Sequence, residues 1–376
     1  MTTPFQTCFS KLQDPRVQGR TYYPLIEIVF LCVCAIVSGS EGWEAIEDFG
    51  HAKLAWLRNY FPYENGIPVH DTIARVIAAL SPKSFQSCFI EWVQLVAELT
   101  DGEVIAIDGK RSRGSYDKRS RKDALHMVSA WACGNNVVLG QEKTTDKSNE
   151  ITAIPALLEL LTLKGCIVTI DAMGCQKEIA EKIIESEADY VLALKGNHGQ
   201  LHEAIQDFFE VSLTDDFKNV TYDHHDETDA GHGRIEERDC YTVVVPDYLK
   251  PLTEQWKKLN TLICVESKRH INGSPETERR YFISSLKSNA KQCASAIRQH
   301  WKIENSLHWV LDVTFKEDAS RIRRDNAANN FTVLRHMALN LLKKKKDPIK
   351  MSIPRKRRKA SYYDEYRSEV LKNIAF

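Results

Sequence analysis

Apolar residues recur at helical spacing through the first hundred positions. Three segments place apolar side chains three or four residues apart, which is the spacing of helices with a buried face. These segments are 25–39, 43–61 and 70–99. Ser81 followed by Pro82 predicts a helix N-cap with proline at the first helical position. We therefore predict an all-helical N-terminal domain over residues 1–98.

The spacing becomes β-like after Gly102. Short apolar runs appear in EVIAIDGKRSRG and in HMVSAWACGNNVVLGQEKT, where Gly134, Asn135 and Asn136 predict a hairpin turn. Further along, predicted helices alternate with the runs GCIVTIDAMGCQ and ADYVLALKGNH. Three strands in hairpin order followed by this alternation predict an α/β fold, with a mixed sheet and flanking helices.

Residues 211–285 break this alternation, because β-like runs and polar turns there predict a β-rich insertion. A last helix follows in QHWKIENSLHWVLDVTFKEDASR, residues 299–321. We predict that a second domain spans residues 99–342 and contains the insertion. Residues 343–376 form a basic C-terminal tail, and its lysine- and arginine-rich part predicts poor order.

Charge is distributed unevenly along the chain. The 376 residues hold 51 Lys and Arg against 51 Asp and Glu, yet residues 287–359 alone hold 19 basic and 6 acidic residues. This asymmetry predicts a polyanion-binding portion beside an acidic one.

The composition also bounds the cellular setting. The ten cysteines form no CxxC pair, which favours free, mostly buried thiols in a reducing cytoplasm over a zinc ribbon. The longest apolar run, residues 23–39, is interrupted by Glu27 and predicts a buried helix, so we expect no contact with a membrane. The first residues lack a basic region followed by an apolar stretch, so no secretory signal is expected.

Two aspartates stand at the ends of predicted strands. Asp108 ends the first strand, and Asp171 ends the run IVTI. Adjacent carboxylates at strand ends can hold divalent ions, since Mg²⁺ prefers carboxylate oxygens and keeps positions open for phosphate. The alternative for either aspartate alone is a turn residue or a helix N-cap. A metal site would need a third carboxylate, which the last helix can supply.

Among the acids of that helix, Glu304 is the expected third ligand. Glu304, His308 and Asp312 are spaced by four and share one face, opposite an apolar side. That apolar side is formed by Ile303, Leu307, Val310 and Leu311. Asp312 is the second candidate, but it lies about 11–12 Å further along the axis, so both acids cannot bind the same metal pair.

The remaining notable residues of this segment have structural interpretations. Asp312, Glu317 and Asp318 would then pair with arginines of the following segment, which are Arg321, Arg323 and Arg324. Trp301 and Trp309 are expected in the core or at a domain interface, with stacking on a displaced DNA base as the alternative. His308 is expected to be structural.

Six motifs together resemble the ISAs1-family transposases, which include the H-repeat-associated proteins of enteric bacteria and belong to the wider IS4-like group. The motifs are DPRVQGRTYYPL, IAIDGKRSRGS, TIDAMGCQ, LALKGNH, GHGRIEER and HWKIENSLHWVLDVTFKED. The resemblance implies an RNase H-like catalytic domain with an Asp-Asp-Glu triad of Asp108, Asp171 and Glu304. It further implies two Mg²⁺ or Mn²⁺ ions, cleavage and strand transfer on double-stranded element ends and target DNA, and a homo-oligomer on DNA. A cytoplasmic, nucleoid-associated bacterial protein is expected.

The last helix departs from the wider IS4-like pattern. That pattern places a tyrosine, an arginine and a lysine around the glutamate, where this chain has Ile297, His300 and Leu311. His300 could contact DNA in place of the arginine. The departure puts the roles of the basic members in doubt and leaves the triad in place.

Several basic residues are candidate DNA contacts. Strand ends supply Lys110, Arg111, Lys195 and His198, the motif GHGRIEER supplies His232 and Arg234, and Lys147 and Asn149 are weaker candidates. The basic tail could act as a non-specific DNA clamp, and the helical domain could bind DNA ends or dimerise. The alternative for each basic group is a solvated face. A zinc site in DHHDETDAGHG is disfavoured, because its spacings match no closed site.

Two other functions remain open from the sequence. One is a catalytically silent DNA-binding remnant of a mobile element. The other is a structure-specific nuclease on the same fold, which would cleave DNA without joining it to a target.

Overall fold

The computed structural model describes residues 3–17, 19, 21–116, 123–144, 150–231, 234–271 and 274–372. Lys147, Asn149 and His232, named above as candidate DNA contacts, lie outside the described residues, as does the side chain of Arg234. No helix within the described part of the chain is long and apolar enough to span a membrane. All ten cysteines are free and buried, as predicted.

By its internal contacts the chain divides into two compact units. One unit holds residues 1–98, 109–147 and 304–376, and the other holds residues 99–108 and 148–303. The predicted N-terminal domain therefore shares its unit with later segments. The boundary falls inside a strand after Asp108 and inside a helical segment after Ile303.

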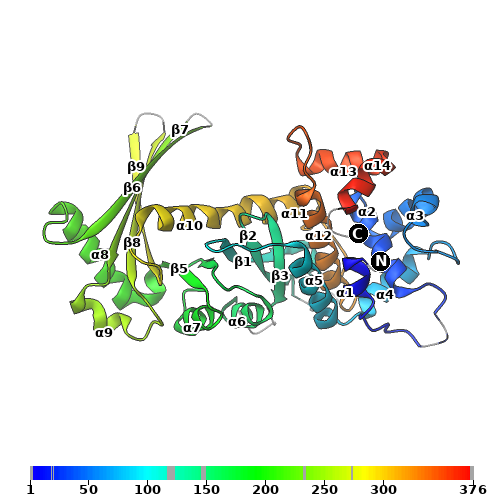
Figure 1. Cartoon of the computed structure of the whole chain (residues 1–376), viewed down its shortest axis with the longest axis horizontal. Coiled ribbons are helices and arrows are strands. Elements are labelled where there is room, and N and C mark those ends of the chain that lie inside the picture. Colours follow the sequence, from blue (N-terminus) through cyan, green and yellow to red (C-terminus); the bar gives the residue numbers. More distant parts are fainter. Residues whose placement is uncertain are drawn as a thin grey trace. The chain divides into compact units, whose positions relative to one another are not determined.

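The N-terminal helices form as the apolar spacing predicted (blue to cyan in Figure 1). They are α1 (Pro4–Phe9), α2 (Leu25–Val37), α3 (Trp43–Leu57), α4 (His70–Ala79) and α5 (Pro82–Val96). Ser81 caps α5 by accepting a hydrogen bond from the backbone N–H of Ser84, and Pro82 is the first helical residue. Helix α12 (Ala327–Lys344) packs against α2, α4 and α5, so its apolar residues complete the same core.

Nine strands form one mixed sheet in the order β3-β2-β1-β4-β5-β9-β8-β7-β6. The strands are β1 (Val104–Ser112), β2 (Leu125–Ala132), β3 (Val137–Lys143), β4 (Ile167–Ile170), β5 (Asp189–Leu194), β6 (Tyr222–Gly231), β7 (Arg234–Val244), β8 (Thr261–Ile271) and β9 (Ser274–Ser284). β1, β4 and β5 are parallel, whereas β2–β3 and β5–β9–β8–β7–β6 are antiparallel. The predicted α/β class and the β2–β3 hairpin are confirmed, and Asn136 has the left-handed backbone that such a turn uses.

The predicted β-rich insertion is confirmed as the strands β6 to β9, which extend the sheet from β5 (green to yellow in Figure 1). Helices α6 (Glu150–Leu160), α7 (Lys177–Glu185) and α8 (Gly199–Thr214) alternate with the parallel strands, and the short α9 (Lys250–Thr253) precedes β8. Helix α10 (Ala290–Ile303) contacts each of the strands β4 to β8 and so crosses one face of the sheet.

Strand β3 lies at an edge of the sheet, and a buried side chain of α12 pairs with its backbone. The side-chain Oδ1 of Asn340 accepts from the N–H of Val138 at 2.8 Å, and its Nδ2 donates to the carbonyl of Val138 at 2.9 Å. Asn340 thus supplies the donor and acceptor that a neighbouring strand would supply. The edge is closed by a helix, which limits pairing with another chain.

The prediction that the basic tail is poorly ordered is wrong. It forms α13 (Ile353–Tyr362) and α14 (Asp364–Lys372). The Arg357 guanidinium is buried, lies over the Phe315 ring and donates to the carbonyls of Ile36 and Thr314. The composition misled because cations that donate to buried carbonyls and stack on aromatic rings serve as packing residues.

Candidate active site

Asp108 and Asp171 lie side by side where the ladder between β1 and β4 ends. The prediction that Asp108 ends its strand is wrong, because β1 continues beside β2 to Ser112. β1 and β4 run parallel, with Ile107 opposite Ile170 as the last pair in the ladder. Asp108 is the next residue of β1 and Asp171 directly follows β4, and both belong to the same compact unit. Parallel register therefore brings the two carboxyl groups to the same edge, as the sequence predicted.

Asp171 is held by the turn that follows it. Its Oδ1 accepts hydrogen bonds from the backbone N–H of Met173 at 3.0 Å and of Gly174 at 3.3 Å. Within the described residues, its Oδ2 has no hydrogen bond, so one oxygen is left for a ligand. Glycine is required at position 174, because a Cβ there would lie 2.3 Å from Cγ2 of Ile170.

A second loop, at the end of β5, holds the same turn through Asn197 and His198. The sequence pointed to His198 but not to Asn197. The Asn197 side chain donates to the Ala172 carbonyl at 2.8 Å. Nε2 of His198 donates to the Cys175 carbonyl at 2.5 Å, and the His198 ring packs edge-on against Trp256. His198, predicted to contact DNA, thus has a structural partner. The signal for Asn197 was its place beside a predicted strand end, in LALKGNH.

Helix α10 approaches the aspartates through His300. Nδ1 of His300 lies 3.0 Å from the hydroxyl Oγ1 of Thr169, which is two residues before Asp171. Glu304 follows His300 by four residues, so it lies one turn further along the helical segment. The missing arginine of the wider family pattern is thus replaced by a histidine that binds the sheet.

Glu304 starts a π-helical turn, Glu304–His308, which leads into α11 (Trp309–Val313). Its side chain is 57% exposed, and its Oε2 lies 3.1 Å from Nδ1 of His308. His308 is buried, and burial lowers its pKa while Glu304 opposes the shift. His308 therefore orients the Glu304 carboxylate from the protein side, in line with the structural role predicted for it.

The helix ends at Val313, so Glu317 and Asp318 lie in a loop and not on the helix. Their predicted pairing with arginines of the following segment is wrong. The Lys110 ammonium lies 2.6 Å from Asp312, 3.0 Å from Glu317 and 3.4 Å from Asp318. Gly114 lets this loop approach, because a Cβ there would lie 2.4 Å from the Ser320 carbonyl oxygen. Lys110 is thus paired with three carboxylates of this segment.

Glu317 links Lys110 to a second buried cation on α12. Its Oε1 lies 3.6 Å from Nη1 of Arg335 and 3.3 Å from the hydroxyl of Thr332, and both charged side chains are under 5% exposed. The nearby cations hold the pKa of Glu317 below its usual value despite full burial. Sequence reasoning missed Arg335, although an arginine in the apolar run FTVLRHMALNLL was a sign of a buried ion pair.

Trp301 and Trp309 are not in the core, which was one of the two places expected for them. Trp301 is 47% exposed and Trp309 is 55% exposed. The Arg280 guanidinium lies 5.4 Å from the ring centre of Trp301. Lys195, which directly follows β5, and Arg111, which lies within β1, are exposed too. The histidines of β6 pair along the hairpin, with His224 beside Asp239 at 2.9 Å.

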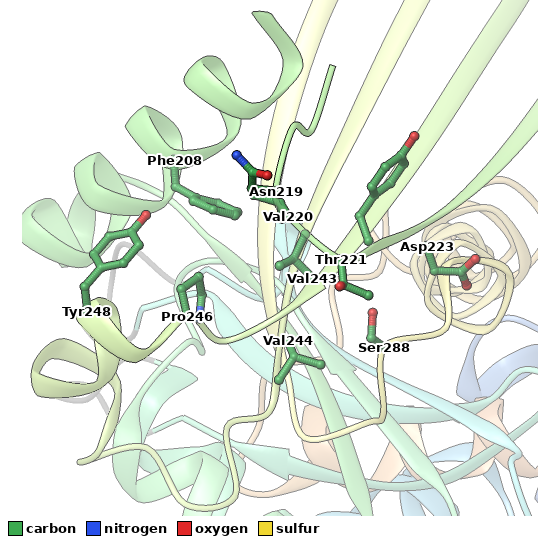
Figure 2. A pocket seen from close by; sticks show the side chains of 11 residues that line it. Phe208, Asn219, Val220, Thr221, Asp223, Val243, Val244, Pro246, Tyr248 and Ser288 are labelled. Atoms are coloured by element: carbon green, nitrogen blue, oxygen red, sulfur yellow. The ribbon is translucent and has the colours of Figure 1, made fainter. Parts of the chain in front are cut away.

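A cavity of about 470 Å³ lies elsewhere, between α8 and the strands β6 and β7 (Figure 2). Phe208, Val243, Val244 and Tyr248 give it mostly apolar walls. Its one carboxylate, Asp223, accepts from the N–H of Ala290 at the start of α10. This acid caps a helix, so the cavity holds no cluster comparable to the strand-end aspartates.

His336 supplies a pH-dependent prediction for the core beside this network. It is 1% exposed on α12, and burial lowers its pKa from 6.5 to about 4. The unfolded chain therefore takes up this proton first, and stability should fall as pH drops from about 6.5 to 4, by about 3 kcal/mol. We expect the midpoint of thermal unfolding, measured from pH 7.5 to 4.5, to fall less in His336→Leu. Parallel curves for the two proteins would contradict this.

Comparisons with known proteins show the family of the chain. Residues 6–93 match the family model described as DDE_Tnp_1-associated, and residues 99–341 match the transposase DDE domain. "Putative transposase YncI" of Escherichia coli O157:H7 is 50% identical over 367 residues, covering 96% of this chain and 93% of that protein. "H repeat-associated putative transposase YhhI" of Escherichia coli K12 is 46% identical, covering 96% of each.

Among solved structures, a cryo-EM piggyBac transposase synaptic complex with hairpin DNA aligns with 98% of this chain and 77% of that one. The TM-score is 0.44 at 10% identity, which is too distant to argue from. The family matches carry the assignment, since the second alone covers more than half of the chain. The chain therefore belongs to the transposases with a DDE domain.

Proposed function

We propose that this protein cleaves DNA at the ends of a mobile element and joins the freed 3′ ends to a target, using Asp108, Asp171 and Glu304. The observation that carries the proposal is the parallel register of β1 and β4, which places the two aspartates next to each other. The helical turn from His300, bonded to Thr169, to Glu304 supports the third member.

The aspartates suit a divalent cation such as Mg²⁺ or Mn²⁺. Both are carboxylates at one sheet edge, and Asp171 keeps Oδ2 free of hydrogen bonds within the described residues. Hard cations prefer such oxygens. We propose that Asp108, Asp171 and Glu304 hold two ions. When bound, the ions supply charge stabilisation at the phosphate and a more acidic attacking hydroxyl.

The surrounding residues have distinct proposed tasks. His308 keeps the Glu304 carboxylate in place, and Asn197 and His198 fix the turn after Asp171. Exposed Lys195 and Arg111 are proposed to hold backbone phosphates, together with Arg234 and His232 of the insertion. Lys110 is not included among these proposed phosphate contacts, because its ammonium lies within 3.4 Å of three carboxylates.

Double-stranded DNA, both element end and target, is the proposed substrate, and pairing two ends requires at least a dimer on DNA. Because the relatives YncI and YhhI are from Escherichia coli, we propose a bacterial, nucleoid-associated protein in the cytoplasm.

An excision and integration assay tests the proposal. Full-length protein with Mg²⁺ is given a plasmid that carries a marked segment between the repeats flanking its own reading frame. Excised segment and joined target products are expected. Cleavage without joined products would support the nuclease alternative, and binding without cleavage would support the silent remnant.

A further inference from the structure

The segment from Lys343 to Lys359 holds ten basic residues and a single acid, Asp347. Six of the ten have partners inside the protein. Lys343 and Lys359 lie over aromatic rings, Lys344 donates to Asn135, Lys345 and Lys356 pair with Asp347, and Arg357 donates to buried carbonyls. Internal structure therefore accounts for more than half of this charge.

Four basic residues are left, which we call the C-terminal basic face: Lys346, Lys350, Arg355 and Arg358. All four are exposed, and the structure gives none of them an ion pair with a described residue. The nearby acids are committed elsewhere, since Asp347 binds Lys356 and Asp364 binds Lys53. These four uncompensated cations fall between positions 346 and 358, and a polyanion would relieve their mutual repulsion.

The face is held on a fixed support. Arg355 and Arg358 are three residues apart on α13, and Tyr362 follows four residues later, so the three share one side of the helix. Tyr362 is 67% exposed. The opposite side is anchored through Arg357, which binds the carbonyl of Ile36 at the end of α2. Cations presented by an anchored helix lose little freedom on binding a ligand.

We propose that the C-terminal basic face, with Tyr362, binds the phosphate backbone of duplex DNA without reading its sequence. This rests on the proposed function, because it takes DNA as the polyanion that this protein meets. Arginines and lysines with an exposed tyrosine are the groups that contact phosphate and sugar in such interfaces. The face adds a contact that is separate from the strand-end carboxylates in the sequence and in its chemistry.

The test measures binding of full-length protein to a labelled 40-base-pair duplex of arbitrary sequence, in EDTA, across a salt series. The variant carries Lys346→Gln, Lys350→Gln, Arg355→Gln and Arg358→Gln. Each phosphate contact adds about 0.9 to the slope of log Kd against log salt, so the slope should fall by about 3–4. Affinity at 0.1 M salt should fall about tenfold or more.

A matched control removes the same charge from four exposed lysines scattered over the chain, with Lys83→Gln, Lys218→Gln, Lys258→Gln and Lys287→Gln. The slope of this control should change by less than about one unit. Equal losses in both variants, or no loss in the first, would overturn the proposal. Polyglutamate displacing DNA at equal charge would also overturn it, because it would indicate an acidic protein as the partner.

The outcomes separate this proposal from the catalytic one. EDTA removes divalent metal ions, so binding measured in it does not depend on the catalytic site. A loss of binding in the quadruple variant therefore supports the C-terminal basic face even if cleavage is never observed. Unchanged binding with normal cleavage would reject the face alone. Thermal unfolding of each variant shows whether the fold is intact. A variant with Arg355→Lys and Arg358→Lys, which keeps both charges, should recover the DNA binding that the quadruple variant loses.

Discussion

Asp171→Asn should abolish DNA cleavage while duplex binding persists. The substitution keeps the size of the side chain and its turn-forming oxygen but removes the charge that a cation needs. We expect the cleavage rate to fall by more than about 1,000-fold, which is about 4 kcal/mol in activation free energy. Asp108→Asn and Glu304→Gln should have losses of the same order. Gel separation of cleaved plasmid gives the rates.

Asp312→Asn tests whether Glu304 or Asp312, the second candidate on the helix, takes part in cleavage. Asp312 lies 2.6 Å from the Lys110 ammonium, which explains its presence without a role in cleavage. Its rate should stay within about tenfold of the unmodified protein. Asp171→Cys adds a metal test, because a thiolate favours Mn²⁺ over Mg²⁺ relative to a carboxylate. Activity of Asp171→Cys should return in part with Mn²⁺, and full activity of any triad variant would remove that residue from the triad.

Glu317→Gln should destabilise the protein by about 3–5 kcal/mol, because it leaves Lys110 and Arg335 without their shared buried carboxylate. Glutamine preserves the shape, so the loss reports the charge. The midpoint of thermal unfolding, followed by circular dichroism at pH 7.5, measures the effect. Asp318→Asn is the matched control, because Asp318 contacts the same lysine but is 31% exposed, and it should cost under about 1 kcal/mol.

Equal shifts in the two variants would contradict a buried charge network. The Glu317 effect should also depend on pH. The pKa of Glu317 is lowered in the folded protein, so its contribution is present above the unfolded value of about 4.5 and is lost as pH falls below it. The difference between Glu317→Gln and the unmodified protein should therefore shrink in acid.

The periodic parts of the fold were predictable from the sequence because burial on one face leaves a regular apolar spacing. The strand that carries Asp108, the strand that leads to Asp171 and the helical segment that carries Glu304 follow from this spacing and from the motifs around them, although β1 runs on to Ser112. Composition alone did not show that Trp301 and Trp309 lie outside the core, since large apolar side chains can stay exposed where a surface has another use.

The contacts that hold the candidate site together were not predictable. Lys110 meets Glu317 and Asp318 across some 200 positions, and the sequence offers nearer arginines as partners for these acids. Likewise, the basic residues of the tail were predicted to be poorly ordered, because the amino-acid sequence does not reveal that Arg357 donates to the carbonyl of Ile36. Pairings between distant segments depend on the packed fold, which a local pattern does not contain.

The π turn that begins at Glu304 has a consequence for comparing this chain with distant relatives. A π turn accommodates one residue more than an α-helical turn, so positions after Glu304 are advanced by one relative to a uniform helix. A motif counted at constant spacing then falls on Leu311, whereas the spatially equivalent position is Asp312. Asp312 is an acid, so the lysine of the wider pattern is missing at either position. Removing one residue from this turn would rotate all of α11 by about 100°, so insertions and deletions here should be far less tolerated than substitutions.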